Sequence, residues 1–462
     1  MFKGKKVLLF GLGILGGGLE TAKFLLKQGA RLTITDSKTR KELSPSISKL
    51  PKNVVYKLGS HNVKDINSSD IIVFNQSVPY QSEWVKKARQ FKKPIFSDLS
   101  LFLTVLGERS DHAEYIAVTG TRGKTTTTTW IGHFLDATIG GNMPDRGLLK
   151  IAKEKTKLYA LELSSFQLEY NQRKLLAPKI AVITNLYRDH LNRYGKMEKY
   201  AKEKAKIFLN QTTADFLILN ADDDWSKFFL EQKPKAQIFW FSLRPLPKNK
   251  KGLCLDGDKI VYQDCQSFVI AKIPFQNSAK QYTLLRSLLT AYLYHPDWNI
   301  LLDKIETLPQ VKLRQEHIFD NGRLQVINDG AATSPDGTMA LLENYHKSTE
   351  RVVLITGGTN KDLEYSDWAK EVKLVIKPSN LFFLDGSATQ KMITELRQIN
   401  YWFESEEPKI FQNFTDIFTE IKITDKTVIL FSPGAASFGL FNNEFDRSDK
   451  FIHAFKQSGL RD

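Results

Sequence analysis

A short turn with two glycines sets the first limit on the fold of this chain. It lies in YIAVTGTRGKTTTTTW, residues 115–130, between an apolar run and a run of threonines. The apolar run predicts a buried strand, and the turn then leads into a helix. Backbone N–H groups at a helix start, Lys124 and the Thr125 hydroxyl are together typical of a phosphate-binding loop. Val118 stands where the common motif needs a glycine, so the sequence predicts a shorter loop of this kind.

The N-terminal part of the chain alternates strand-like and helical patterns. An apolar run at 5–10 precedes a glycine-rich turn, a helical pattern and a second strand that ends at Asp36. Two more strand-like runs follow at 70–79 and 92–98, and this alternation indicates an open parallel sheet. The turn GLGILG at 11–16 also fits the dinucleotide fingerprint, so an NAD-dependent oxidoreductase remains an alternative.

The same alternation returns twice more along the chain. The length of 462 residues suggests about three domains. The segments 97–112 and 307–318 look like linkers. We therefore predict an α/β protein with three domains, 1–96, 97–308 and 309–462, and with hinges at the two linkers.

Composition narrows the kinds of partner. The chain carries 66 Lys and Arg against 51 Asp and Glu, a formal charge of +15, which favours anionic partners. A nucleic-acid-binding NTPase would need interleaved basic and aromatic residues or a helicase motif, and the sequence shows neither. Cys254 and Cys265 lack metal or disulfide spacing, and no apolar run approaches the roughly 18 residues of a membrane span. We expect a soluble cytoplasmic protein with neither a nucleic-acid nor a membrane partner.

Nine stretches, in their order and spacing, resemble the Mur ligase family over nearly the whole chain. They are TGTRGKTT (119–126), GGN (140–142), LELSSFQLE (161–169), TNLYRDHLNRYG (184–195), YAKEKAKIF (200–208), LNADD (219–223), INDGAATSPDGT (327–338), TGGTNKDLEY (356–365) and FSPGAASFGLFNNEFDR (431–447). The shortened phosphate loop resembles the ATP loop of this family. The resemblance implies a Rossmann-like UDP-binding domain, a central P-loop ATPase domain and a C-terminal Rossmann-like domain that binds the incoming amino acid.

The resemblance is greatest to the D-glutamate-adding ligases, and it implies a reaction. Such an enzyme joins glutamate to UDP-N-acetylmuramoyl-L-alanine with ATP, through an acyl phosphate, in cytoplasmic peptidoglycan precursor synthesis. ATP and two Mg²⁺ ions are the implied cofactors, and a monomer is the implied assembly. Ala331, Thr359 and Glu444 depart from the family pattern near the nucleotide and amino-acid contacts. L-glutamate or another amino acid therefore stays open as the substrate.

The resemblance also assigns roles in the central domain. The implied catalytic residues are Lys124, Glu162, His190, Lys204 and Asn142. Thr125, Glu162 and His190 are the implied Mg²⁺ ligands; a carboxylate such as Glu162, after a buried strand, is costly unless it serves a cation. Lys204 occupies the position of a carbamylated lysine. The implied ATP contacts are Gly120, Thr121, Gly123, Lys124, Thr125, Thr126, Asn277, Arg314 and Asp329.

Substrate contacts are implied in the outer two domains. The glycine loop of the first domain would receive the UDP diphosphate, and the end of its second strand would lie near the uracil. The implied residues there are Gly13, Ile14, Leu15, Asp36, Asn75 and Ser77. In the third domain, Lys361 and Ser437 would hold the carboxylates of glutamate, with help from Thr333.

Other branches of the family make different predictions. A diaminopimelate- or lysine-adding ligase should carry the sequence DNPR in its third domain, and this chain lacks it. A folylpolyglutamate synthase normally has no preceding UDP-binding domain. The alanine-adding first ligase has a similar N-terminal domain, so it is the closer relative to exclude.

Overall fold

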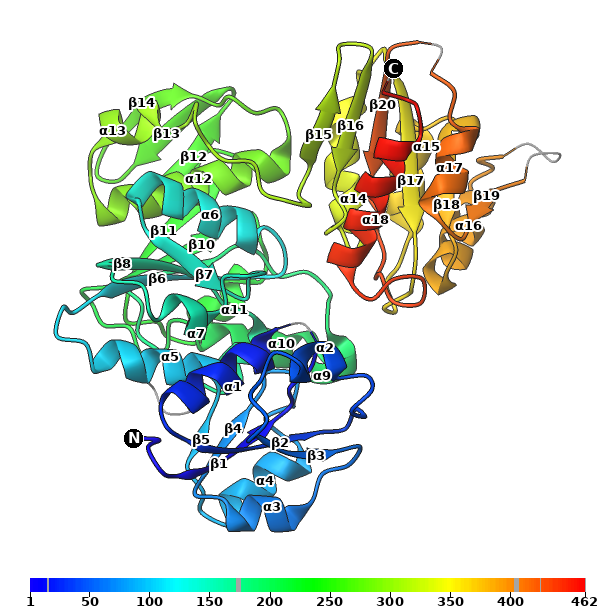
Figure 1. Ribbon diagram of the computed structural model, residues 1–462. Helices are drawn as coiled ribbons and strands as arrows, with labels where there is room; N and C mark the ends of the chain where they lie inside the picture. Colours follow the sequence, from blue (N-terminus) through cyan, green and yellow to red (C-terminus); the bar gives the residue numbers. More distant parts are fainter. Residues whose placement is uncertain (15, 172–175, 403–406, 424, 462) are drawn as a thin grey trace. The chain divides into compact units, whose positions relative to one another are not determined.

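A computed structural model describes residues 1–14, 16–171, 176–402, 407–423 and 425–461 (Figure 1). The chain divides into two compact units, one of residues 1–272 with 283–308 and the other of residues 273–282 with 309–462. The first unit holds a five-stranded and a nine-stranded sheet, and the second holds a six-stranded sheet. The α/β class predicted from the sequence is therefore confirmed. In the described part of the chain, no helix has the length and apolar character needed to cross a membrane.

The five-stranded sheet is parallel, in the order β3-β2-β1-β4-β5. Its central strands β1 and β4 are almost wholly apolar because helices cover both faces. Gly18 is required where α1 leaves the glycine turn, since a Cβ there would lie 2.2 Å from the Leu12 carbonyl oxygen. The elements are β1 (Lys6–Phe10), α1 (Gly17–Lys27), β2 (Arg31–Asp36), α2 (Ser44–Ile47), β3 (Val55–Leu58), α3 (Val63–Ser68), β4 (Ile71–Phe74), α4 (Glu83–Gln90), β5 (Ile95–Phe96) and α5 (Asp98–Gly107).

The nine-stranded sheet has the order β14-β13-β12-β11-β10-β9-β6-β8-β7, and only β12 to β14 pair antiparallel. Strand β6 lies between β8 and β9, so the loops at their carboxyl ends meet at one edge. The elements are β6 (Glu114–Thr119), α6 (Lys124–Leu135), β7 (Thr138–Gly141), α7 (Leu148–Ile151), β8 (Leu158–Glu162), α8 (Ser165–Leu168), β9 (Ile180–Ile183), α9 (Leu191–Tyr194), α10 (Met197–Ala205), β10 (Phe216–Asn220), α11 (Ser226–Glu231), β11 (Gln237–Ser242), β12 (Gly252–Asp256), β13 (Lys259–Gln263), β14 (Ser267–Lys272), α12 (Ser278–Tyr294) and α13 (Trp298–Asp303).

The six-stranded sheet has the order β15-β16-β20-β17-β18-β19, with β15 antiparallel to the rest. Apolar residues of α14, α15 and α16 pack on one face, and those of α17 and α18 pack on the other. The elements are β15 (Glu316–Asp320), β16 (Leu324–Asn328), α14 (Pro335–Leu342), η1 (Glu343–Tyr345), β17 (Arg351–Gly357), α15 (Ser366–Val375), η2 (Pro378–Asn380), β18 (Leu381–Leu384), α16 (Ser387–Gln398), β19 (Lys409–Phe411), α17 (Phe414–Glu420), β20 (Thr427–Phe431) and α18 (Glu444–Gln457).

Candidate active site

The shortened phosphate loop connects β6 to α6, as the sequence predicted. Gly123 caps α6 with φ 76°, in the left-handed region that favours glycine, and a Cβ there would lie 2.3 Å from Arg286 Nη2. Lys124 is the first residue of α6, and its Nζ donates to the Thr121 carbonyl oxygen at 3.0 Å. The loop thus places a cation and the N–H groups of a helix start together, which suits a phosphate group.

The loop after β9 holds the phosphate loop in place. Thr121 N donates to Asn185 O at 3.0 Å, and Arg122 N donates to Asn185 Oδ1 at 2.9 Å. Thr184 Oγ1 in turn donates to Arg122 O at 2.7 Å. A Cβ on Gly120 would lie 1.8 Å from that threonine oxygen. The close approach therefore excludes any larger residue at position 120.

A carboxylate and a hydroxyl meet beside the phosphate loop. Glu162 ends β8 and is 3 % exposed. Thr125 Oγ1 donates to Glu162 Oε2 at 2.7 Å, and Asn142 Nδ2 donates to Glu162 Oε1 at 3.4 Å. Three of the residues expected to act on ATP therefore lie together. Hydroxyl and carboxylate oxygens are ligands that Mg²⁺ prefers.

The described residues include no cluster of three or more His, Cys, Asp or Glu spaced to hold a metal ion. A Mg²⁺ ion on a nucleotide needs fewer protein ligands, because phosphate oxygens and waters complete its coordination. Thr125 and Glu162 fit that requirement. The ring of His190 lies 4.9 Å from the Phe166 ring, and its Nδ1 is 3.8 Å from Asp189 Oδ1. Its role as a second Mg²⁺ ligand stays a prediction.

Lys204 is buried in α10, with only 1 % of its surface exposed. Its Nζ donates to Gly120 O at 2.7 Å and lies 4.5 Å from the centre of the Tyr200 ring. Burial lowers the pKa of Lys204 well below its usual value, and the positive charge of Lys124 lowers it further. The amine is therefore inclined to lose its proton.

One glutamine connects the five-stranded sheet to this cluster. Gln76 follows β4; its Nε2 donates to Asn142 Oδ1 at 3.1 Å, and its Oε1 accepts from Ser164 Oγ at 2.7 Å. These bonds fix which way the Asn142 amide faces, because its oxygen meets Gln76 while its nitrogen meets Glu162. The loop after β4 is thereby joined to the carboxylate beside the phosphate loop.

An arginine on α9 holds the backbone of the same loop. Arg193 forms a two-bond ion pair with Glu169, at 2.7 and 2.8 Å. Its guanidinium also donates to Ser77 O at 3.1 Å and to Gln76 O at 3.0 Å. Tyr80 N completes the arrangement by donating to Glu169 Oε2 at 3.0 Å. A largely buried ion pair in which every guanidinium nitrogen donates a hydrogen bond is a firm structural connection.

Within the five-stranded sheet, Asp36 shapes the glycine turn. Its Oδ2 accepts from Leu12 N and Gly13 N at 2.9 and 3.0 Å, and its Oδ1 accepts from Lys38 N at 2.9 Å. Asn75 Oδ1 accepts from Ser77 N at 3.0 Å on the neighbouring loop. Among the other residues expected near the UDP group, Ile14 is 44 % exposed, and Leu15 lies outside the described residues.

In the second unit, Asp329 follows β16 and is buried. Burial raises its pKa to about 7, although the nearby Arg314 opposes the shift. Its carboxylate accepts from Gln315 N at 3.1 Å and from Ser432 Oγ at 3.0 Å, and Arg314 Nη1 donates to Ala331 O at 3.1 Å. Asn277, also buried, donates to Ala340 O and accepts from Lys280 N.

The residues expected to bind glutamate lie on loops that follow neighbouring strands. Thr333, Lys361 and Ser437 come after β16, β17 and β20, whose carboxyl ends share one edge of the six-stranded sheet. Lys361 Nζ is 3.4 Å from Thr333 Oγ1. Buried Arg447 braces two of these loops by donating to Ala435 O and Gly330 O at 3.0 and 3.1 Å.

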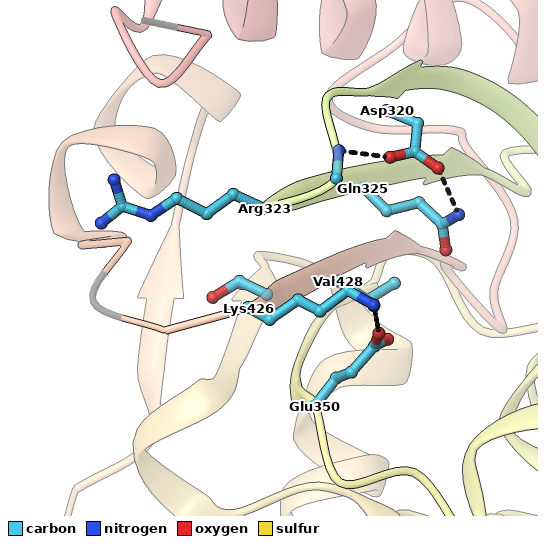
Figure 2. A pocket seen from close by; sticks show the side chains of 8 residues that line it. Asp320, Arg323, Gln325, Glu350, Lys426 and Val428 are labelled. Carbon is cyan, nitrogen blue, oxygen red and sulfur yellow. Dashed lines mark hydrogen bonds and ion pairs between the residues drawn. The ribbon is translucent and has the colours of Figure 1, made fainter.

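A small hollow of about 130 Å³ lies at the opposite edge of the same sheet, where β16 and β20 begin (Figure 2). Two pairs of its side chains are in contact: Lys426 Nζ is 2.6 Å from Glu350 Oε1, and Gln325 Nε2 donates to Asp320 Oδ2 at 3.2 Å. The expected site residues of this unit follow the carboxyl ends of the strands instead. This hollow is therefore not the candidate site.

Sequence reasoning missed the residues that position others. Gln76 and Glu169 were assigned no role, and neither were Arg193 and Arg447, although both arginines fall inside stretches that resemble the family. Local patterns cannot identify them, because each acts through contacts far along the chain. Gln76, for example, bonds residues 66 and 88 positions away.

Comparisons with known proteins cover most of the chain. Two family models match, the Mur ligase MurD-like N-terminal domain at residues 5–97 and the Mur ligase middle domain at 118–284. A UDP-N-acetylmuramoylalanine--D-glutamate ligase of Borreliella afzelii is 32% identical over 97% of both chains. One of Roseiflexus sp. is 31% identical over 97% of both.

Solved structures share the fold at lower identity. The UDP-N-acetylmuramate-alanine ligase MurC of Thermotoga maritima superposes with a TM-score of 0.62 at 19% identity, covering 98% of this chain and 100% of that one. MurF of Acinetobacter baumannii gives a TM-score of 0.60 at 13% identity, covering 98% and 91%. At such identities the likeness concerns the fold alone.

Proposed function

The chain belongs to the UDP-N-acetylmuramoylalanine--D-glutamate ligase family, and from that premise we propose that it adds D-glutamate to UDP-N-acetylmuramoyl-L-alanine with ATP. The reaction would serve cytoplasmic peptidoglycan precursor synthesis, with the protein acting as a monomer. The observation that carries the proposal is the meeting of Thr125, Glu162 and Asn142 beside the phosphate loop, in a chain similar to such ligases over its full length.

The proposed chemistry has two steps. A carboxylate oxygen of the L-alanyl group attacks the γ-phosphorus of ATP, which gives an acyl phosphate and ADP. The amine of glutamate then attacks the acyl carbon, and phosphate leaves. Lys124 and the N-terminus of α6 stabilise the charge on the transferred phosphoryl group. Mg²⁺, held by Thr125 and Glu162 with a second ion at His190, would neutralise phosphate charge when bound.

Lys204 supports the proposed carbamylated form. A lysine must be neutral for its nitrogen to attack carbon dioxide, and burial beside Lys124 favours the neutral amine. The carbamate, which forms as the nitrogen loses a proton to solvent, is an anion. The positive charge of Lys124 would stabilise that anion in a buried place.

We propose the remaining site residues as contacts of the nucleotide or of a substrate. For ATP we propose Gly120, Thr121, Gly123, Thr126, Asn277, Arg314 and Asp329 beside those above. For the UDP-sugar we propose Gly13, Ile14, Leu15, Asp36, Asn75 and Ser77, and for glutamate Thr333, Lys361 and Ser437. We also propose the domains 1–96, 97–308 and 309–462.

The oxidoreductase alternative loses support from the relatives, because the chain is similar to D-glutamate ligases over its full length. Asp36 accepts three backbone N–H bonds and so shapes the turn that we propose for the UDP-sugar.

Phosphate release from ATP tests the proposal directly. The expected result is release that requires UDP-N-acetylmuramoyl-L-alanine together with an amino acid, with D-glutamate preferred to L-glutamate. Equal release with both enantiomers would overturn the stereochemical part. NADH formation without phosphate release would overturn the whole.

A further inference from the structure

The positive charge of this chain is concentrated at one end. Residues 1–97 carry 18 Lys and Arg against 6 Asp and Glu, whereas the other 365 residues carry 48 against 45. Nearly all of the excess therefore belongs to the region of the five-stranded sheet. A site for small phosphorylated ligands does not need such an excess.

Much of this charge lies along one edge of the sheet, where the parallel strands begin. Lys6 pairs with Arg31 across β1 and β2, Lys3 and Lys5 precede β1, and Lys92 and Lys93 precede β5. An acidic residue also lies at this edge: Asp70, just before β4, accepts a hydrogen bond from the backbone N–H of Lys6. The chain's N-terminus, marked in Figure 1, enters the sheet here.

These side chains face solvent. Five of the six basic residues are exposed, and Lys93 is half-buried because its Nζ donates to Asn67 O. In the described part of the chain, none of the six forms an ion pair with a carboxylate. Two apolar side chains are exposed among them: Val55 at the start of β3, 51 % exposed, and Phe91 before Lys92, 37 % exposed.

We propose that this basic edge docks the protein on an anionic phospholipid surface. Lysines near a membrane surface are attracted by anionic headgroups, and exposed apolar side chains add insertion into the interface. Nucleic acid is the less favoured partner, because the edge is rich in lysine and poor in arginine, whose planar fork binds phosphates and bases in pairs. The lack of a spanning segment predicted no membrane partner, but docking on a membrane surface needs no such segment.

Docking at this edge would leave the rest of the domain accessible. The glycine turn, Asp36, Asn75 and Ser77 follow the carboxyl ends of the strands, at the opposite edge of the same sheet. A membrane-bound protein could therefore still take a UDP-sugar. The proposal goes beyond the ligase reaction and does not depend on it.

Vesicle sedimentation of the full chain tests the proposal. With vesicles of phosphatidylglycerol and phosphatidylcholine we expect binding at least about tenfold tighter than with phosphatidylcholine alone, and its loss when salt is raised from about 50 to 500 mM. The variant K3E/K5E/K92E should bind at least about tenfold more weakly, and the neutral K3Q/K5Q/K92Q should fall between. Both should keep the wild-type rate of ATP-dependent phosphate release, which shows that they fold.

A matched control changes the same charge elsewhere. K347E/K391E/K456E alters three exposed lysines of the second unit and should keep vesicle binding within about threefold. Equal loss in this control would show an effect of net charge and would overturn the basic edge as the docking surface. Two results would overturn the lipid assignment. One is wild-type protein that does not bind the anionic vesicles. The other is release of bound protein by single-stranded RNA that binds the same lysines more tightly.

Discussion

The loops that follow the strands of the nine-stranded and six-stranded sheets are built differently. Around the phosphate loop, short internal bonds hold the functional groups, such as Thr125 to Glu162 at 2.7 Å. On the six-stranded sheet, exposed Lys361 has a long 3.4 Å contact, and Asp329 has a pKa near 7. Groups fixed in advance suit charge stabilisation in a transition state. An exposed cation and a titrating acid suit ligand binding. Changes in the first region should therefore lower kcat, and changes in the second should alter binding.

The largest effect is expected for Lys124→Met. Removal of the loop cation should lower kcat by about 10³-fold, because the charge on the transferred phosphoryl group loses the cation at the start of α6. Steady-state phosphate release measures it, with the exposed Lys153→Met as a control that should stay near the wild-type rate. A Lys124→Met rate above about a tenth of wild type would break the contrast between the two regions.

Glu162→Gln should come next, with a kcat about 10²-fold lower. Glutamine keeps an oxygen that can accept from Thr125 but removes the negative charge that attracts Mg²⁺. The Mg²⁺ concentration for half-maximal rate should rise, and a titration measures it. Glu154→Gln, on the loop before β8, serves as the control. An unchanged Mg²⁺ dependence in Glu162→Gln would contradict its assignment as a metal ligand.

A smaller effect is expected for Gln76→Glu, about tenfold in kcat. Glutamate keeps an acceptor for Ser164 but cannot donate to Asn142 Oδ1. If Gln76 acts through Asn142, combining Gln76→Glu with Asn142→Ala should add little to Asn142→Ala alone. Kinetics of the two single variants and the double variant measure this. Fully additive losses would show that Gln76 works independently of Asn142.

The smallest effect concerns the second region and depends on pH. The folded pKa of Asp329 is about 7, above the usual carboxyl value, so the carboxylate forms only as pH rises through that value. If the carboxylate accepts from the ribose, ATP should bind a few-fold more tightly at about pH 8 than at about pH 6. Calorimetric titration measures this, and Asp329→Asn should bind ATP with much less change. An identical pH profile in that variant would show that another group titrates.

Much of the fold was predictable from periodicity, and the failures are informative. The buried strands β1, β4 and β6 were found because each is a largely continuous apolar run. The short edge strands β3 and β19 were missed because edge strands are short and partly polar. The expected linker 307–318 in fact contains the start of β15 at Glu316. The exposed and partly buried residues of β15 alternate only imperfectly, so its sequence cannot be told apart from that of a loop.

The candidate site, like the fold, was predictable only in part. The phosphate loop was predictable because a loop of this type needs glycines and a lysine close together in sequence. The environment of Lys204 was not, because its low pKa arises from burial and from Lys124, eighty positions earlier. The bracing roles of Arg193 and Arg447 likewise depend on carbonyl groups that only the fold brings near.

In the proposed reaction, ATP activates the carboxylate of the UDP-sugar. The most direct test uses UDP-N-acetylmuramoyl-L-alanine labelled with ¹⁸O in that carboxylate, followed by mass spectrometry of the released phosphate. An acyl phosphate predicts one ¹⁸O atom in each phosphate released, since the oxygen that attacked phosphorus leaves with it. Phosphate without label, formed as quickly as the amide product, would contradict the account.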